Sequence, residues 1–200
     1  MDIVQRSRQT VAVTAGKAYQ RHLTCAGLGA ISVRLPLDDL FLITPFGVGL
    51  GDVRSDQICL IDTEGKPAET FPGLAAPPET PLYLNAFRER PDVNAIAHLH
   101  PPYATAYAVR GQVFPLLTGT IRRALNEVLK VDCRECPSRF SGLCTCNTDV
   151  RLGHAGVGAL LLKQDGILSL GADLATVLHL ADLVENAARV AYLSATHRCG

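Results

Sequence analysis

The sequence lacks an excess of charge of either sign. Its 200 residues hold 19 Lys and Arg against 19 Asp and Glu, and no run of like charges forms a tail. Proteins that bind nucleic acid or an anionic membrane surface usually carry a basic patch that shifts this balance. We therefore expect neither nucleic acid nor a membrane as a partner.

The sequence also lacks the roughly 18 uninterrupted apolar residues that a membrane-spanning helix requires. Residues 1–15 contain Asp2, Arg6 and Arg8 but no continuous apolar segment, in contrast to a secretory signal peptide. These two absences predict a cytoplasmic protein. Because 48% of the residues are apolar and 19% are charged, we expect a globular chain with a single domain over residues 1–200.

Apolar spacing and chain breakers predict helices that alternate with strands. Helical spacing is found over residues 3–24, 82–90, 103–109 and 173–195. Short apolar runs bounded by turn residues predict strands. These runs are residues 31–35, 41–44, 58–62, 94–100, 155–162 and 166–170. Together they predict one layered α/β structure.

Two histidines stand at the end of the fourth predicted strand. Side chains two residues apart in a strand point to the same face, so His98 and His100 converge while Leu99 turns into the opposite layer. Neutral imidazoles are good ligands for zinc and similar ions. A pair of partly buried histidines without a metal is the alternative, but their position where the strand opens into a loop favours a metal site.

The chain around these histidines resembles the class II aldolase/adducin family. The resemblance is carried by residues 79–106, which read ETPLYLNAFRERPDVNAIAHLHPPYATA. Three further segments are similar to family motifs: GLGAISVR at 27–34, ITPFG at 43–47 and LLLKQDGILSLG at 160–171. The similarity covers most of residues 5–195, with a gap at about 115–152. It implies a three-layer α/β/α fold with a central, mostly antiparallel sheet.

The resemblance implies a zinc-type divalent ion on three histidines, two of them at the positions of His98 and His100. It also implies that Glu79 is the acid–base group and that the protein is a homotetramer with sites between subunits. The residues assigned to substrate binding are Gly29, Thr44 and Gly47. A cation beside a carbonyl stabilises developing negative charge, and a nearby carboxylate can move the proton. Glu79 has a second interpretation, as a carboxylate favoured by the dipole at a helix N-terminus.

The third ligand position departs from the family pattern. Asp165 stands where the third histidine is expected, and two histidines with one carboxylate suit Fe(II) or Mn(II) as well as zinc. We expect Asp165 to complete the site, with His154 as the alternative ligand, although Asp165 could also be a solvated turn residue. A histidine that often follows the glutamate by four residues in the family is replaced by Tyr83, whose role stays open.

The phosphate-binding positions of the family's sugar-phosphate members also differ. The hydroxyl and amide residues of those members correspond here to Ala30, Phe46, Pro77 and Pro78. Each replacement removes a hydroxyl or amide donor, and each proline also lacks a backbone N–H. We therefore expect a small, unphosphorylated hydroxy-oxo compound or acid as the substrate, aromatic or carboxylated in character.

Four cysteines form a cluster in an insert at about residues 131–149. They are Cys133, Cys136, Cys144 and Cys146. Their spacing, C-x2-C-x7-C-x-C, is typical of a closed tetrahedral zinc site in a reducing compartment. An iron–sulfur cluster and disulfides are the other interpretations. We expect a second, structural zinc ion there.

The leading hypothesis is a metal-dependent lyase of the class II aldolase type, which acts by aldol cleavage or decarboxylation through a metal-stabilised enolate. A non-catalytic, adducin-like binding or assembly domain is the first alternative, because the third ligand and the phosphate positions are altered. A metal- or redox-regulated variant that uses the cysteine insert is the second. Retention of Glu79, His98 and His100 favours the enzyme over the scaffold.

Overall fold

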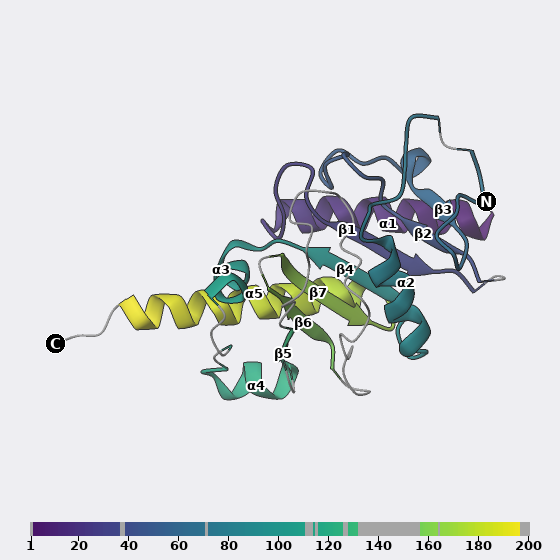
Figure 1. Cartoon of the computed structure of the whole chain (residues 1–200). Helices are drawn as coiled ribbons and strands as arrows, with labels where there is room; N and C mark the ends of the chain where they lie inside the picture. Colours follow the sequence, from purple (N-terminus) through teal and green to yellow (C-terminus); the bar gives the residue numbers. More distant parts are fainter. Residues whose placement is uncertain are drawn as a thin grey trace.

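A computed structural model describes residues 2–36, 39–70, 72–110, 114, 116–125, 128–131, 157–163 and 165–196 of the chain (Figure 1). The helices are α1 (Ile3–Gln20), the short 3-10 helix η1 (Ser55–Gln57), α2 (Thr80–Glu89), α3 (Pro102–Arg110), α4 (Gly119–Leu125) and α5 (Leu174–Thr196). The strands are β1 (Ala30–Arg34), β2 (Phe41–Ile43), β3 (Cys59–Ile61), β4 (Ala95–Leu99), β5 (Val128–Val131), β6 (Ala159–Leu162) and β7 (Gly166–Gly171). The four clustered cysteines and His154 lie outside the described residues, so the predictions made for them remain predictions.

The strands of the described residues form one seven-stranded sheet in the order β3-β2-β1-β4-β7-β6-β5. Neighbouring strands run antiparallel, except that β5 and β6 are parallel. β4, which leads into the histidine pair, lies at the centre of the sheet between β1 and β7. The mostly antiparallel sheet that the family resemblance implies is therefore confirmed.

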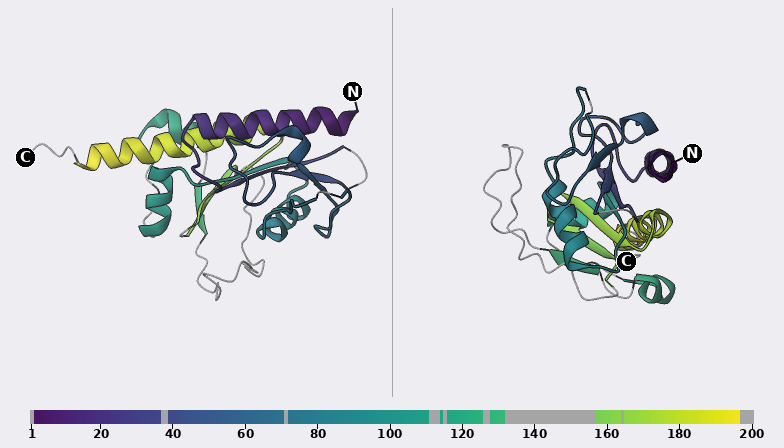
Figure 2. Two further views of the ribbon diagram at one scale, coloured as in Figure 1. Left: turned by 90° about the horizontal axis from the view of Figure 1, so that it is seen from above. Right: turned by 90° about the vertical axis from the view of Figure 1, so that its right-hand side faces the viewer.

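Alternate residues of the strands pack against helices on opposite faces of the sheet. In β4, Ala97 and Leu99 lie in the core that contains residues of α1, α3 and α5. Ile96 lies in a second core with Tyr83 and Phe87 of α2. Figure 2 shows α1 and α5 side by side on one face of the sheet and α2 on the other. The predicted three-layer α/β/α arrangement is thus confirmed, and Leu99 turns away from α2 as expected.

The first helix ends at Gln20, earlier than the end near Gly27 that the helical spacing over residues 3–24 predicts. The backbone of His22 has a φ of 58°, in the left-handed region. The N–H groups of His22 and Leu23 donate to the carbonyl oxygens of Tyr19 and Ala18 at 2.9 and 3.0 Å. This pattern closes a helix C-terminus by satisfying its last carbonyl groups.

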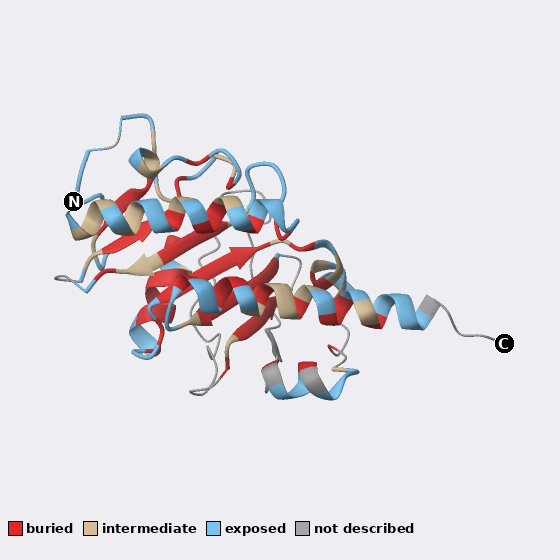
Figure 3. Cartoon of the chain, turned by 180° about the vertical axis from the view of Figure 1, so that it is seen from behind, coloured by how far each residue is buried: buried red, intermediate tan, exposed pale blue. Residues whose placement is uncertain are grey.

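The last helix covers much of one face of the sheet and confirms the long helix predicted over residues 173–195. Its fully buried residues include Val177, Ala181 and Val184, at helical spacing. Figure 3 shows the buried sides of α1 and α5 against the sheet and the exposed C-terminal turns of α5 beyond it. Among the described helices, none combines the length and the apolar character that crossing a membrane requires.

Candidate metal site

His98 lies in β4 on the face of the sheet that α2 covers. Only 2% of the residue is exposed. Its Nε2 lies 3.1 Å from the backbone oxygen of Asp165 and 3.5 Å from Oδ2 of the same residue. Burial lowers the pKa of His98 by more than the charge of Asp165 raises it. The ring is therefore held neutral, which is the form of histidine that binds a metal.

His100 follows β4 directly, where Pro101 ends the strand. Its backbone N–H donates to the carbonyl oxygen of Leu23 at 3.0 Å, which fixes the chain at this point. The ring centroids of His98 and His100 are 4.9 Å apart, with an angle of 37° between the rings. Nε2 of His100 lies 3.4 Å from Oδ1 of Asp165, and its Nδ1 is buried without a hydrogen-bond partner among the described residues. The two rings converge, as the strand period predicts.

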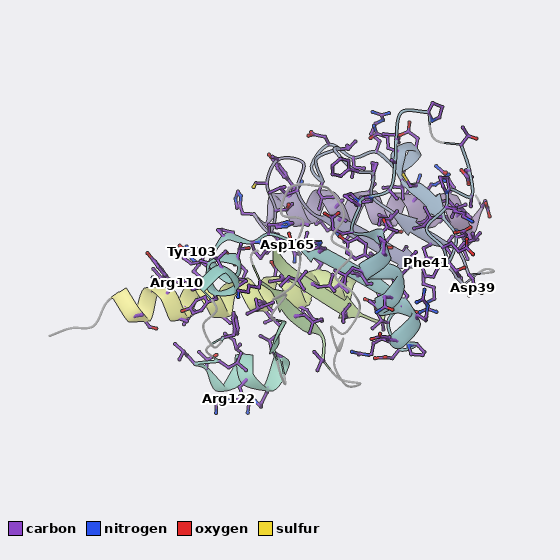
Figure 4. The ribbon with its side chains drawn as sticks, in the orientation of Figure 1. Asp39, Phe41, Tyr103, Arg110, Arg122 and Asp165 are labelled. Carbon is purple, nitrogen blue, oxygen red and sulfur yellow. The ribbon has the colours of Figure 1, made fainter. Side chains whose placement is uncertain are left out.

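Asp165 approaches the histidines from the turn between β6 and β7 (Figure 4). Its backbone N–H donates to the carbonyl oxygen of Leu162 at 3.1 Å, and Gly166 follows with a φ of +100°. A Cβ atom at Gly166 would overlap the carbonyl oxygen of Leu99 and lie 3.1 Å from Cδ2 of His100. Glycine therefore allows the turn to close against the end of β4. The side chain of Asp165 remains 51% exposed, so a small molecule can reach it.

The three side chains fit a divalent metal ion. One nitrogen of His98, one nitrogen of His100 and one carboxylate oxygen of Asp165 lie within 4.8 Å of one another. Ligands around a tetrahedral zinc ion, with bonds of about 2.0–2.1 Å, are separated by about 3.4 Å. Nε2 of His100 lies 3.4 Å from Oδ1 of Asp165 and Nε2 of His98 lies 3.5 Å from Oδ2, so each nitrogen is at about this distance from one of the two carboxylate oxygens. Two imidazoles and one carboxylate also leave a coordination position open, as in catalytic zinc sites.

The charge of Asp165 suits the same role. Partial burial raises the pKa of its carboxyl group, but the hydrogen bond from His100 and the electrostatic attraction of the two imidazole rings lower it further than burial raises it. The net pKa lies below the ordinary value for aspartate. Asp165 is therefore an ionised carboxylate at neutral pH, the form that ligates a cation.

Helix α2 brings Glu79 and Tyr83 to the same face of the sheet. Glu79 precedes the first turn of α2, is half-buried and makes no side-chain capping hydrogen bond. Tyr83 lies one turn later, is only 2% exposed, and places its hydroxyl oxygen 2.7 Å from Nδ1 of His98. Burial, and then the charges of Glu79 and Asp165, raise the pKa of Tyr83 well above its ordinary value. Tyr83 is therefore a neutral hydroxyl in contact with the site, a role that the sequence left open.

Of the three residues predicted to bind substrate, Gly29 and Gly47 lie in loops and Thr44 lies in the core. Gly29 has a φ of 90°, and a Cβ atom there would lie 2.8 Å from the carbonyl oxygen of His98. Gly47 has a φ of 77° and lies in an exposed turn. Thr44 is 0% exposed, and its Oγ1 accepts a hydrogen bond from the N–H of Ile31 at 3.1 Å. The loop that holds Gly29 thus borders the site, whereas Thr44 belongs to the core.

The positions that replace the family's phosphate donors lie in the same loops and in the segment before α2. Phe46 is 61% exposed, and its backbone N–H donates to the carbonyl oxygen of Ala75 at 2.8 Å. The carbonyl oxygen of Pro77 accepts from the N–H and Oγ1 of Thr80, at 3.0 and 2.6 Å. Ala30 is buried at the start of β1. The donors of Phe46 and Thr80 are thus already used within the protein.

The chain is similar to known proteins over nearly its whole length. The family model for the class II aldolase and adducin N-terminal domain matches residues 9–192. An L-fuculose phosphate aldolase of Methanococcus vannielii is 30% identical over 177 residues, which cover 88% of this chain and 90% of that protein. A 3,4-dihydroxyphthalate decarboxylase of Arthrobacter keyseri is 34% identical over 110 residues, or 52% of this chain and 44% of that protein. The solved L-fuculose 1-phosphate aldolase of Glaciozyma antarctica shares the fold, with a TM-score of 0.80 and 18% identity over 97% of this chain and 75% of that chain.

Proposed function

The chain belongs to the class II aldolase and adducin N-terminal domain family, and on this basis we propose that it is a metal-dependent lyase. The observation that carries the proposal is the convergence of His98, His100 and Asp165, whose ligand atoms lie within 4.8 Å of one another. Glu79 lies one helical turn before Tyr83, which contacts His98, and this spacing supports Glu79 as the acid–base group. The named relatives are aldolases and decarboxylases, and the site contains the groups that such reactions use.

Each residue of the site has a role in this proposal. The imidazoles of His98 and His100 and the carboxylate of Asp165 hold a divalent ion, with zinc, Mn(II) and Fe(II) all compatible with this ligand set. The bound ion supplies a Lewis acid that polarises a carbonyl group and stabilises developing negative charge. The carboxylate of Glu79 accepts the proton of the substrate hydroxyl when an aldol bond breaks, and returns a proton to carbon. In a decarboxylation only the return of a proton is needed, because carbon dioxide leaves without one.

The substrate in this proposal is a small hydroxy-oxo compound or acid without a phosphate group. Recognition of phosphate requires free N–H and O–H donors. The turn that holds Gly47 instead presents the exposed ring of Phe46, while the N–H of Phe46 and the hydroxyl of Thr80 bond to the backbone. Because these hydrogen-bond donors are already used, they support an aromatic acid as the substrate over a sugar phosphate. The Arthrobacter keyseri relative is named for such an acid, and the Methanococcus vannielii relative for a sugar phosphate.

Three further parts of the proposal rest on sequence pattern and family resemblance. They are a structural zinc ion at the four clustered cysteines, a homotetramer with sites between subunits, and a cytoplasmic location. An adducin-like binding domain without catalysis is the competing function. Such a domain has no evident need for a neutral buried histidine, an ionised aspartate and a second histidine in ligand geometry, so the site favours the enzyme.

Metal analysis of the purified protein and of His98→Ala tests the proposed function. We expect a divalent metal that the variant lacks, and loss of lyase activity in the variant. Because the cysteines are a second candidate site, Mn(II) is the better probe, since thiolates bind it poorly. Failure of the wild-type protein to bind any added divalent metal at the histidine site would contradict the proposal. Activity on matched compounds with and without phosphate then tests the substrate class.

A further inference from the structure

Among the described residues, the buried ring of His98 has one hydrogen-bond partner on each of its two nitrogens. Nε2 lies 3.1 Å from the backbone oxygen of Asp165, which can only accept a hydrogen bond. Nδ1 lies 2.7 Å from the hydroxyl oxygen of Tyr83, which can donate or accept. Because the carbonyl requires a donor, Nε2 carries the ring proton in the metal-free protein. Nδ1 must then accept the hydrogen of Tyr83.

The opposite arrangement is required when Nε2 is a metal ligand. Its lone pair then faces the cation, so the neutral ring carries its proton on Nδ1, and Nδ1 must donate. We propose that Tyr83 is a positioning residue that supports His98 in both states, by donating to Nδ1 in the metal-free protein and accepting from Nδ1 when Nε2 ligates a metal. This inference rests on the proposed metal site. The ring holds one proton in each state, so the exchange moves a proton from Nε2 to Nδ1 without net uptake or release.

A tyrosine is suited to this position in a way that the usual partners are not. Metal-binding histidines commonly donate their second nitrogen to a carboxylate or a backbone carbonyl, and both of these can only accept. Those partners fit the metal-bound tautomer alone. The hydroxyl of Tyr83 fits both tautomers, and the ring of Tyr83 is held in the α2 core beside Phe87. The His98 ring therefore keeps its orientation, with Nε2 toward Asp165, whether or not a metal is bound.

The same hydroxyl connects the metal ligand with the proposed acid–base group. When Tyr83 accepts from His98, its own hydrogen needs another acceptor, because this site is buried. Glu79 lies four residues earlier on the same side of α2 and its charge acts on Tyr83, so in this proposal its carboxylate is that acceptor. Ligation at Nε2 thus turns the Tyr83 hydrogen toward Glu79. In the metal-bound protein, Tyr83 thus accepts a hydrogen bond from His98 and donates one to Glu79, the proposed acid–base group.

The first test is the dissociation constant for Mn(II), measured from the free-ion signal in electron paramagnetic resonance, for wild type and Tyr83→Phe. The variant leaves an N–H group without an acceptor in the metal-bound form but only a bare ring nitrogen in the metal-free form, and the orphaned N–H is the costlier of the two, so binding is expected to weaken by about 10–100-fold. Tyr107→Phe is the matched control, because it removes the hydroxyl of a half-buried tyrosine that packs on Phe114 outside the site. Equal affinities of wild type and Tyr83→Phe would overturn the inference. Failure of the wild type itself to bind Mn(II) would overturn the proposed metal site, which distinguishes the two.

The second test needs no variant of Tyr83 and decides the question if Tyr83→Phe does not fold. Nitrogen-15 spectra of histidine-labelled protein report which ring nitrogen of His98 carries the proton, with the signal assigned by its loss in His98→Gln. We expect the proton on Nε2 without metal and on Nδ1 with zinc bound. A proton on Nδ1 in the metal-free protein would show that Tyr83 accepts in both states and would overturn the inferred reversal.

Discussion

A side chain at Gly166 would overlap the carbonyl oxygen of Leu99, so the turn that carries Asp165 closes on β4 because the next residue is glycine. The φ of Gly166, +100°, also lies in the region that residues with a Cβ atom rarely adopt. The third ligand of the proposed site therefore depends on a residue that contributes no side chain.

Replacing Gly166 with alanine is expected to lower the free energy of unfolding by about 1–3 kcal/mol from backbone strain alone. It should also weaken Mn(II) binding, because relief of the overlap moves Asp165 away from the histidines. Denaturant unfolding and metal titration measure the two effects. Gly16→Ala is the control, since no atom lies within 4 Å of the new Cβ in helix α1 and alanine favours a helix by about 0.5–1 kcal/mol. A Gly166→Ala protein as stable as the wild type would contradict this interpretation.

Asp165→Ala is expected to weaken metal binding by more than the roughly 10–100-fold that loss of an outer partner costs, because a direct ligand is lost. Asp165→His should bind again but with a higher preference for zinc over Mn(II), since imidazole suits zinc better than carboxylate does. Competition titrations with zinc and Mn(II) measure this preference. Metal that His98→Ala still binds is subtracted, because it belongs to other sites such as the cysteine cluster. Asp56→Ala removes an exposed carboxylate paired with Arg54 and serves as the control. Unchanged metal binding in Asp165→Ala would show that Asp165 is not a ligand and would favour His154 as the third ligand.

Glu79→Gln is expected to lower kcat by about 10²–10⁴-fold while the affinity for Mn(II) stays unchanged. The reason is that Glu79 lies outside the three-ligand group, so the amide removes proton transfer without removing a ligand. Steady-state kinetics and metal titration on the same preparation separate the two. Glu89→Gln, at the far end of α2, is the matched control. Loss of metal binding in Glu79→Gln would indicate that Glu79 is a metal ligand and not only the acid–base group.

The ion pair between Arg90 and Asp92 makes stability depend on pH. Nε and Nη2 of buried Arg90 donate to Oδ1 and Oδ2 of Asp92 at 2.8 and 2.6 Å, and Nη1 donates to the carbonyl oxygen of Val157 at 3.1 Å. The hydrogen bonds from Arg90 lower the pKa of Asp92 below its ordinary value. The contribution is therefore complete above the unfolded-state pKa of about 3.9 and is lost as pH falls through the lower folded-state pKa.

The expected difference in unfolding free energy between wild type and Asp92→Asn is at most about 1 kcal/mol above pH 4, since the Asp92 side chain is half-exposed. The difference should shrink toward zero as pH falls below the folded-state pKa of Asp92. Chemical unfolding at a series of pH values measures it. A difference that stays constant down to the lowest pH would show that protonation of Asp92 does not break the pair.

The positions of the two histidines follow from local sequence. The two-residue period of a strand decides that His98 and His100 share a face and that Leu99 does not, and the structure agrees. The long C-terminal helix is predictable for the same reason, because its apolar spacing is local and sustained. The sequence predicts no helix or strand between residues 115 and 152, where the structure has α4 and β5. Both elements are too short to show a clear apolar spacing, and they lie in the gap between the segments that resemble family motifs.

The contacts between distant segments could not be read from spacing. Tyr83 follows Glu79 by four residues, which places both on one side of a helix, but nothing local shows that this side packs over His98. From sequence, Asp165 is a candidate ligand only because the family resemblance marks its position. The need for Gly166 beside it becomes visible when β7 is paired with β4.

Anomalous scattering at the zinc edge, from crystals grown with zinc, would show directly whether His98, His100 and Asp165 bind a metal. We expect a peak about 2.0–2.2 Å from Nε2 of His98, Nε2 of His100 and a carboxylate oxygen of Asp165. A peak at the cysteine cluster is expected as well and does not bear on this site. Crystals that show no anomalous peak among His98, His100 and Asp165 would show that these residues do not form a zinc site.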